Sequence, residues 1–129
     1  MKDIYEKEIT VQSAHLDLLQ HVNNVTYLQW VQDMAEAHWT AKSTHAINEE
    51  VYWVVLSHYI EYKKPAFLGD QLTGRTFVEN SDGFRSERHV EFYRGGQLLA
   101  RAETQWCLID RRTHRPKRIS EEIKELFRA

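Results

Sequence analysis

The sequence predicts an α+β domain in which an antiparallel sheet packs against a single long helix. One segment, residues 25–43, repeats its apolar residues at three- and four-residue spacing, which is typical of an amphipathic helix. The later segments are rich in β-branched and aromatic residues, and turn signals join them as antiparallel hairpins. The chain has 129 residues and no linker-like stretch, so one domain over residues 1–129 is expected.

The first half of the chain predicts a strand, a loop and the long helix. Residues 4–11 place apolar side chains among charged ones and predict the strand, and residues 13–24 form an irregular loop. Asn23 or Asn24 can cap the helix, because an asparagine side chain accepts a hydrogen bond from a first-turn amide. The apolar helix face is predicted to comprise Tyr27, Leu28, Val31, Met34, Ala35 and His38 or Trp39.

The second half predicts four strands, at residues 51–62, 71–79, 84–93 and 98–109. Residues 80–83 give one turn, and the pair Gly95-Gly96 suits a two-residue hairpin. Ser120 caps a short terminal helix over residues 120–127. One face of the first of these strands is predicted to carry Tyr52, Val54, Leu56, His58, Ile60 and Tyr62. This element order is that of a hotdog fold, a five-stranded antiparallel sheet wrapped around a long central helix, with a short C-terminal helix.

Composition excludes several classes of function. Hydrophobic residues make up 42% and charged residues 28%, which argues against disorder. The net charge of -2 gives no overall attraction to nucleic acid or to an anionic membrane. No signal-peptide core or membrane-length apolar run is visible, so a cytoplasmic protein is expected. The single cysteine, Cys107, precludes an internal disulfide or a cysteine zinc cluster, and we expect no metal or cofactor.

The loop before the helix holds the residues with chemical potential. Asp17 and His21 stand four apart beside the helix N-terminus, where free amides and the positive dipole end can hold an oxyanion. A carboxylate aimed at the same place can activate water or attack a carbonyl. Asp, His and Asn before a helix are more often caps and turn residues, so the residue types alone leave this structural alternative open.

Two segments with fixed spacing resemble a known family. The run Asp17-x-x-x-His21-Val22-Asn23-Asn24-x-x-Tyr27 resembles the signature of hotdog thioesterases of the 4-hydroxybenzoyl-CoA thioesterase family, and residues 16–27 with Trp30 are also similar to acyl-ACP (acyl carrier protein) thioesterases. The run Ile60-Glu61-Tyr62-x-x-Pro65-Ala66-x-x-Gly69-Asp70 resembles the family's second landmark, the end of the strand that follows the helix. The resemblance implies a thioester hydrolase.

The same resemblance assigns roles by position. Asp17 matches the catalytic aspartate, described as a general base or a nucleophile. Asn24 matches the helix-start position whose backbone amide binds the thioester oxygen. His21 matches a histidine of the motif, which either orients the carboxylate or bonds the loop, and Tyr27 is either a substrate contact or a packing residue.

Four positions depart from the family pattern. Gln20 stands where many members have glycine, and His15 stands where many have a second acidic residue. Leu19 replaces an asparagine of the acyl-ACP enzymes, and Gln32 occupies a place that often holds glutamate. Because Asp17 is intact, these changes favour a mechanism driven by the aspartate over a fully acyl-ACP-type mechanism.

The resemblance also implies a partner and a substrate. A hotdog sheet leaves one edge open, and the family pairs that edge in a dimer with two interfacial sites, so a homodimer or homotetramer is expected. The substrate is an acyl-CoA or acyl carrier protein thioester, which fits fatty acid metabolism. Candidate substrate-binding residues on the strand facing the site are Val55, His58, Tyr62 and Lys64. Arg85 and Arg88 are candidates for a basic rim that binds the CoA phosphates. Each of these residues has an alternative packing or surface role.

The same fold also allows two other functions. A hydratase or dehydratase would need motifs that the sequence lacks. A non-catalytic module that binds an acyl thioester or an aromatic ligand remains the main alternative. Asp17 argues against it, because a binding pocket gains nothing from a desolvated carboxylate.

Overall fold

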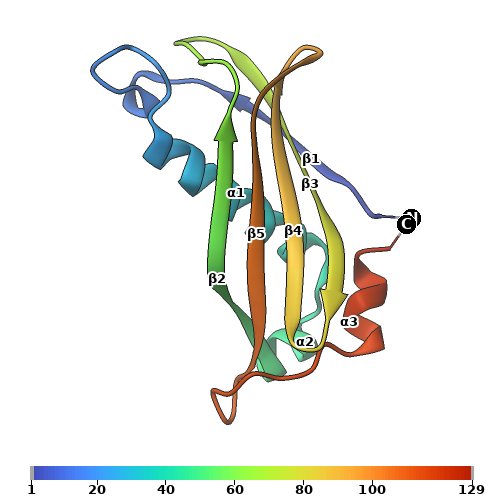
Figure 1. Ribbon diagram of the computed structural model, residues 1–129. Helices are drawn as coiled ribbons and strands as arrows, with labels where there is room; N and C mark the ends of the chain where they lie inside the picture. The colour runs from blue at the N-terminus through green and yellow to red at the C-terminus, as the bar shows by residue number, and fades with distance from the viewer. Residues whose placement is uncertain (1, 129) are drawn as a thin grey trace.

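The computed structural model describes residues 2–128, and its five strands form one antiparallel sheet in the order β1-β3-β4-β5-β2 (Figure 1). The predicted α+β class and five-stranded antiparallel sheet are confirmed. No helix in these residues is long and apolar enough to cross a bilayer. The elements are β1 (Tyr5–Thr10), η1 (Ser13–His15, a 3-10 turn), α1 (Asn24–Lys42), α2 (His45–Glu50), β2 (Val51–Tyr62), β3 (Gln71–Asp82), β4 (Arg85–Arg94), β5 (Gln97–Asp110) and α3 (Glu121–Leu126).

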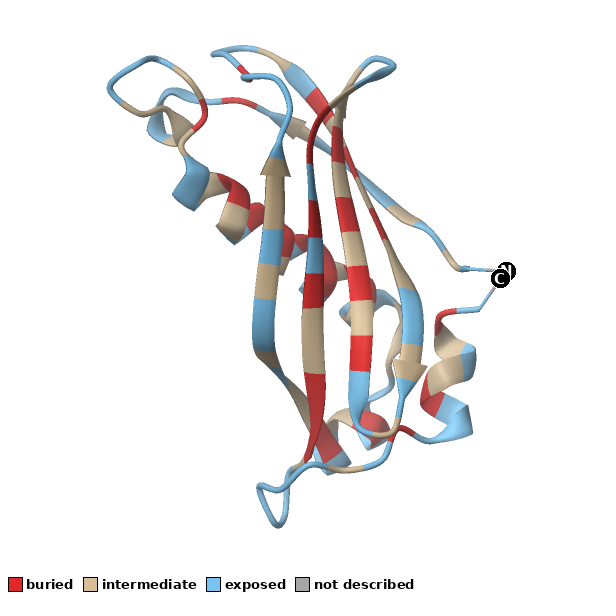
Figure 2. Cartoon of the chain, viewed as in Figure 1, coloured by how far each residue is buried: buried red, intermediate tan, exposed pale blue. Residues whose placement is uncertain are grey.

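Helix α1 crosses one face of the sheet and supplies much of the core (Figures 1 and 2). Asn23 is its N-cap, since the Asn23 side chain accepts a hydrogen bond from the amide of Val25 at 2.9 Å. Gly74 of β3 allows the helix to approach closely, because a Cβ atom there would lie 2.9 Å from Sδ of Met34. The buried helix face comprises Tyr27, Trp30, Val31, Met34, Ala35 and His38, so the prediction missed Trp30.

The predicted face of β2 is wrong in its first half. The pairing of β2 with β5 shifts between Val55 and Ser57, which leaves Leu56 as the extra residue of a β-bulge. An extra residue moves the following side chains to the other face of the sheet. Val54 and Leu56 are therefore exposed, whereas Ile60, beyond the bulge, packs on the core as predicted.

Three smaller features also differ from the prediction. Helix α2 and the turn η1 were missed, because segments of six and three residues are too short to show a helical period. The turn between β3 and β4 lies at Gly83 and Phe84 rather than at residues 80–83, and Gly83 has a φ of 61°. Phe84 is exposed for that reason. The Gly95-Gly96 hairpin and the Ser120 cap of α3 are confirmed.

The inner face of the sheet is filled by two separate clusters of buried residues. The larger one surrounds the first half of α1 and includes Trp30, Val31, Leu72 and Phe92. The second joins α2 and α3 to the far end of the sheet through Ile47, Val51, Leu108, Ile119 and Ile123. The two ends of α1 therefore lie in different surroundings, with the loop of residues 12–23 at one end and α2 at the other (Figure 1).

Candidate functional site

Residues 15–23 form a small hairpin that precedes α1. The amide of Asp17 donates to the carbonyl of His21 at 2.8 Å, and the amide of Asn23 donates to the carbonyl of His15 at 2.8 Å. Gln20 closes the hairpin with a φ of 65°, in the left-handed region that favours glycine. This conformation explains why glycine suits the position where the chain carries Gln20. The hairpin fixes Asp17 opposite His21, at the entrance to the helix.

The Asp17 carboxylate is held by one oxygen and free at the other. Its Oδ1 accepts hydrogen bonds from the amide of Leu19 at 2.8 Å and from the amide of His21 at 3.2 Å. Within residues 2–128, Oδ2 makes no hydrogen bond or ion pair. Because the side chain is only half-buried, Oδ2 can reach water or a substrate. Asp17 is thus a turn residue and also a carboxylate with one available oxygen.

The first turn of α1 offers one free backbone donor. The amide of Val25 is capped by Asn23, and the amides of Thr26 and Tyr27 both donate to the Asn23 carbonyl. In the described part of the chain, the Asn24 N–H has no acceptor, and Asn24 is exposed. A free N–H at a helix N-terminus is suited to an oxyanion. The structure thus leaves open the donor that the resemblance assigns to Asn24.

His21 and Tyr27 have different surroundings. The His21 ring packs edge-on against Phe67, with 5.3 Å between ring centroids, and no side-chain bond joins it to Asp17 in residues 2–128. Tyr27 is 3% exposed and lies against the rings of Trp30, Tyr62 and Phe92. Burial raises the pKa of Tyr27 to about 12, and its hydroxyl has no partner among the described residues. The structure shows the Tyr27 ring packed in the core, and a contact between its hydroxyl and the substrate stays a prediction.

The candidates on β2 are spread along the strand, and Tyr62 at its end packs against Tyr27 in the first turn of α1. His58 lies on the inner face, where Nδ1 is 2.8 Å from the Thr104 hydroxyl and Nε2 is 3.4 Å from Nε2 of Gln32. Burial lowers the pKa of His58, which favours a neutral ring. Gln32 is about 12 Å along α1 from Asn24 at a rise of 1.5 Å per residue, so His58 stands well away from the helix start. The remaining candidates are Val55, which is half-buried, Tyr62 at the end of β2, and Lys64, which is exposed just after the strand.

The expected basic rim is wrong for Arg88. Arg85 is exposed at the start of β4, whereas Arg88 is 6% exposed and points into the interior. Its Nη1 donates to Nδ1 of His38 at 2.8 Å and to the Thr76 hydroxyl at 3.1 Å. Arg88 alternates in phase with the buried Val90 and Phe92, and that period-two pattern would have predicted its burial.

Comparisons with known proteins identify the family of the chain. The thioesterase-like superfamily matches residues 11–127. The chain belongs to this superfamily. The predicted enzyme class, a thioester hydrolase of the hotdog fold, is thereby confirmed, as is the likeness to the 4-hydroxybenzoyl-CoA thioesterase family.

Individual thioesterases align over nearly the whole chain. The long-chain acyl-CoA thioesterase FadM of Escherichia coli (strain K12) is 28% identical over 127 residues, covering 93% of this chain and 94% of FadM. The crystal structure of the probable thioesterase YbaW from Escherichia coli superposes with a TM-score of 0.80 at 27% identity, covering 94% of each chain. Slr0204, a 1,4-dihydroxy-2-naphthoyl-CoA thioesterase from Synechocystis, has a TM-score of 0.81 at 20% identity, covering 95% of this chain and 94% of its own, and shows the shared fold.

The thioesterase also contains a cavity that sequence reasoning did not find. Its volume is about 340 Å³, and it lies between the second half of α1, the far end of the sheet and α3. Helix α1 carries Trp39 into its lining, about 22 Å along the helix from Asn24 at 1.5 Å per residue. The aromatic and aliphatic part of the lining is formed mainly by Trp39, Trp53, Trp106, Ile119, Ile123 and Phe127. These residues come from four segments that are far apart in the sequence, so no local pattern could have predicted the cavity.

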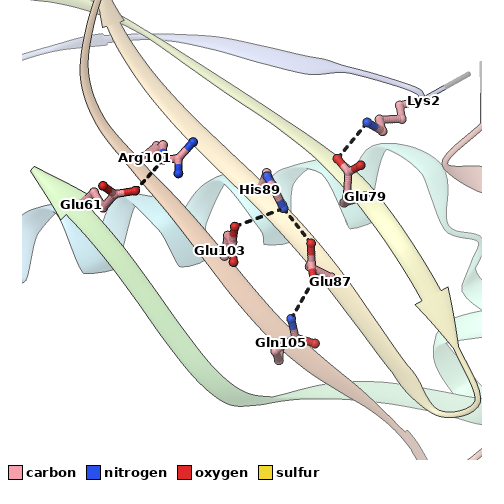
Figure 3. A network of polar contacts seen from close by, with 8 residues as sticks. All are labelled: Lys2, Glu61, Glu79, Glu87, His89, Arg101, Glu103 and Gln105. Carbon is pink, nitrogen blue, oxygen red and sulfur yellow. Dashed lines mark hydrogen bonds and ion pairs between the residues drawn. The ribbon is translucent and has the colours of Figure 1, made fainter. Parts of the chain in front are cut away.

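One group of side chains has the spacing of metal ligands. Potential ligand atoms of Glu87, His89 and Glu103 lie within 4.8 Å of one another on neighbouring strands (Figure 3). His89 Nε2 is 2.8 Å from Glu87, and Gln105 donates to the other oxygen of Glu87 at 3.2 Å. The group lies on the outward-facing side of the sheet, with His89 and both glutamates partly exposed, so these contacts form a surface network of hydrogen bonds and ion pairs.

Proposed function

We propose that this thioesterase hydrolyses acyl-CoA, with Asp17 as base or nucleophile and the Asn24 N–H as oxyanion donor. The supporting observation is that one short hairpin leaves a carboxylate oxygen and a first-turn amide both free. As a base, Asp17 takes a proton from water while the water oxygen bonds to the thioester carbon. The oxyanion then collapses, the C–S bond breaks, and the thiolate leaves and is protonated.

The alternative route uses the same two groups. Asp17 Oδ2 bonds to the thioester carbon and expels the thiolate, which leaves a mixed anhydride that water then hydrolyses to the acid and the free carboxylate. In both routes negative charge develops on the former carbonyl oxygen, where a preorganised N–H stabilises it. The name of FadM supports a CoA ester as the substrate, and acyl carrier protein is the second candidate carrier.

Exposed apolar surface supports a homodimer or homotetramer. Large apolar side chains are exposed around the Asp17 hairpin and the adjoining loop: Leu18, Leu19, Val25, Phe67 and Leu68. Strand β2 is an edge strand of 12 residues, and Val54, Leu56 and Tyr59 are exposed on it. Long unpaired edges and clustered apolar side chains are typical of an interface. A partner on β2 would bring Tyr62 and Lys64 to a shared site.

A cytoplasmic setting stays a prediction from the sequence.

The deciding experiment compares wild type with Asp17→Asn. Thiol release is measured on short-, medium- and long-chain and aromatic acyl-CoAs. Asparagine keeps an oxygen that accepts from Leu19 and His21 but cannot act as the base or nucleophile, so kcat/KM should fall about 10²–10⁴-fold with the fold unchanged. Equal rates in the two proteins would remove Asp17 from the mechanism. Absence of turnover on CoA and acyl carrier protein esters alike would favour the non-catalytic binding module.

Asp17→Ala serves as the structural control. It removes the same carboxylate and also leaves the Leu19 and His21 amides without their acceptor, which should cost about 1–3 kcal/mol of stability. Asp17→Asn should therefore unfold at a temperature close to that of wild type, and Asp17→Ala should unfold several degrees lower, about 3–6 °C for each kcal/mol. Similar loss of rate in both variants then assigns the loss to the carboxylate and not to the hairpin.

A further inference from the structure

The cavity beside α3 has the dimensions and walls of a ligand site. Its volume of about 340 Å³ is within the range of small-molecule sites, and its walls are mainly aromatic and aliphatic. Helix α3 closes one side through Ile123, and Trp39 of α1 and Trp53 of β2 meet edge-on with 5.7 Å between ring centroids. An apolar chain or ring of modest size is the natural occupant of such a space.

Arg88 contributes an unbalanced positive charge to this cavity. The guanidinium lines the cavity, and burial lowers its pKa to about 10, so it is still protonated at neutral pH. Its two hydrogen-bond partners, His38 Nδ1 and the Thr76 hydroxyl, are both uncharged acceptors. Within residues 2–128, no carboxylate forms an ion pair with Arg88. The Phe127 ring, with its centroid 5.4 Å from Cζ of Arg88, stabilises the charge in part through a cation–π contact. A buried charge without an anionic partner is still costly.

The nearest acidic group in the network is already shared. His38 Nε2 bonds to Asp3 at 2.7 Å, and Lys42 pairs with the other oxygen of Asp3 at 3.1 Å. Two cations, Arg88 and Lys42, therefore depend on one carboxylate, and Arg88 reaches it only through a neutral imidazole. Of the other charged residues that line the cavity, Lys124 pairs with Glu121 at 3.6 Å, and Glu36 is exposed to solvent. Among the described lining residues, Arg88 is therefore the buried charge without an ionic partner.

Trp106 adds a second unused donor. Trp106 lies on β5 opposite Ser86 of β4, and both residues line the cavity. Its indole N–H is buried with no acceptor among the described residues. Buried donors normally have a partner, and the absence of one is a signal that an acceptor comes from outside the chain. A guanidinium and an indole N–H in one apolar cavity match an apolar group that ends in an anionic oxygen group.

We propose that this cavity binds an alkyl or aryl group that ends in a carboxylate, with Arg88 as the anion-binding residue and Trp106 as a second donor. Two sources supply this chemistry: a free carboxylic acid, which thioester hydrolysis releases, and the distal carboxylate of a dicarboxylic acyl thioester. The first source does not depend on the catalytic role of Asp17. The second rests on the proposed acyl-CoA hydrolysis and would define the substrate class.

Binding is tested with decanoate and with methyl decanoate, which has the same chain and no charge. Tryptophan fluorescence reports occupancy, because three tryptophans line the cavity. Wild type should bind decanoate at least about tenfold more tightly than the ester, and Arg88→Met should abolish that preference. Equal binding of the two ligands by wild type, or an unchanged preference in Arg88→Met, would overturn the proposal.

A second variant covers the case in which Arg88→Met does not fold. Trp106→Phe removes an N–H that makes no bond in the described residues, so the fold should be kept, and circular dichroism melting checks this. It should weaken decanoate binding about 3–10-fold while leaving methyl decanoate nearly unaffected. Parallel weakening of both ligands would show that the indole only fills space and would contradict its role as a donor.

Turnover then separates the two sources and the two proposals. Decanedioyl-CoA is compared with decanoyl-CoA, in wild type and in Arg88→Met. A preference for decanedioyl-CoA that Arg88→Met removes identifies the distal carboxylate as the ligand, and charge-selective decanoate binding without that preference identifies the free acid. If neither ester is hydrolysed while decanoate binding depends on Arg88, the proposed function fails and the anion site stands. If both esters are hydrolysed and neither ligand binding nor the rate depends on Arg88, the proposed function stands and the anion site is refuted.

Discussion

Replacing Asn24 by proline removes the proposed oxyanion donor and little else. Asn24 is the first helical residue of α1, a position at which proline is favoured because its missing N–H is not needed there. Asn23 has φ -66° and ψ 140°, which is the extended region that a residue before proline adopts. The N–H to be lost makes no bond within residues 2–128, so the free energy of unfolding should change by less than about 0.5 kcal/mol.

The expected kinetic loss is much larger than that structural effect. One oxyanion donor is typically worth about 10²–10³ in kcat, or roughly 3–4 kcal/mol. Asn24→Ala is the matched variant, because it removes the side chain and keeps the N–H. We expect Asn24→Pro to lose about 10²–10³ in kcat in the thiol-release assay, with a normal melting temperature, and Asn24→Ala to retain most of its rate. A folded Asn24→Pro protein that turns over within a few-fold of wild type would refute the assignment of the oxyanion to this amide.

Two further predictions concern stability. Gln20→Gly should match or raise the melting temperature, since it removes about 1–2 kcal/mol of left-handed strain against about 0.5–1 kcal/mol of added chain entropy. Gln20→Val should lower it by several degrees, and a fall of equal size in both variants would contradict the strain argument. Burial lowers the pKa of His38 and His58, so below their ordinary pKa of about 6.5 the unfolded chain takes up protons that the folded chain does not. The urea midpoint should therefore fall between pH 7 and pH 5, and a flat profile over that range would show that the pKa of neither histidine is lowered by folding.

The sequence predicted the elements whose signals are local. Helix α1 and its Asn23 cap, the Gly95-Gly96 hairpin and the Ser120 cap each follow from neighbouring residues, and each is confirmed. The bulge at Leu56 was not predictable, because it depends on how β2 pairs with a strand about fifty residues later in the chain. Arg88 was assigned to a surface rim because charged residues usually lie there, although its phase with Val90 and Phe92 favoured burial. Its partners His38 and Thr76 could not be predicted, because they lie on other elements.

The candidate site, too, could be predicted from the sequence only in part. Spacing and resemblance identified Asp17 and Asn24, but whether their atoms are free depends on which acceptors the neighbouring amides use. Asn23 accepts from Val25 with its side chain and from Thr26 and Tyr27 with its carbonyl, and that arrangement leaves the Asn24 N–H over. No residue-type rule predicts such a distribution of bonds. The cavity could be predicted even less from local sequence, because seven segments line it.

The way in which Asp17 is held reconciles its two interpretations. A carboxylate that takes part in hydrolysis must keep a fixed direction and must also reach water, and full burial without a partner would be unfavourable for its charge. Bonds from two backbone amides to Oδ1 give the direction, and a half-buried position leaves Oδ2 accessible. Because the amides belong to the hairpin itself, this orientation does not require core packing at this exposed end of the molecule. The turn geometry expected of a purely structural aspartate is therefore also compatible with the reactive role that we propose for Asp17.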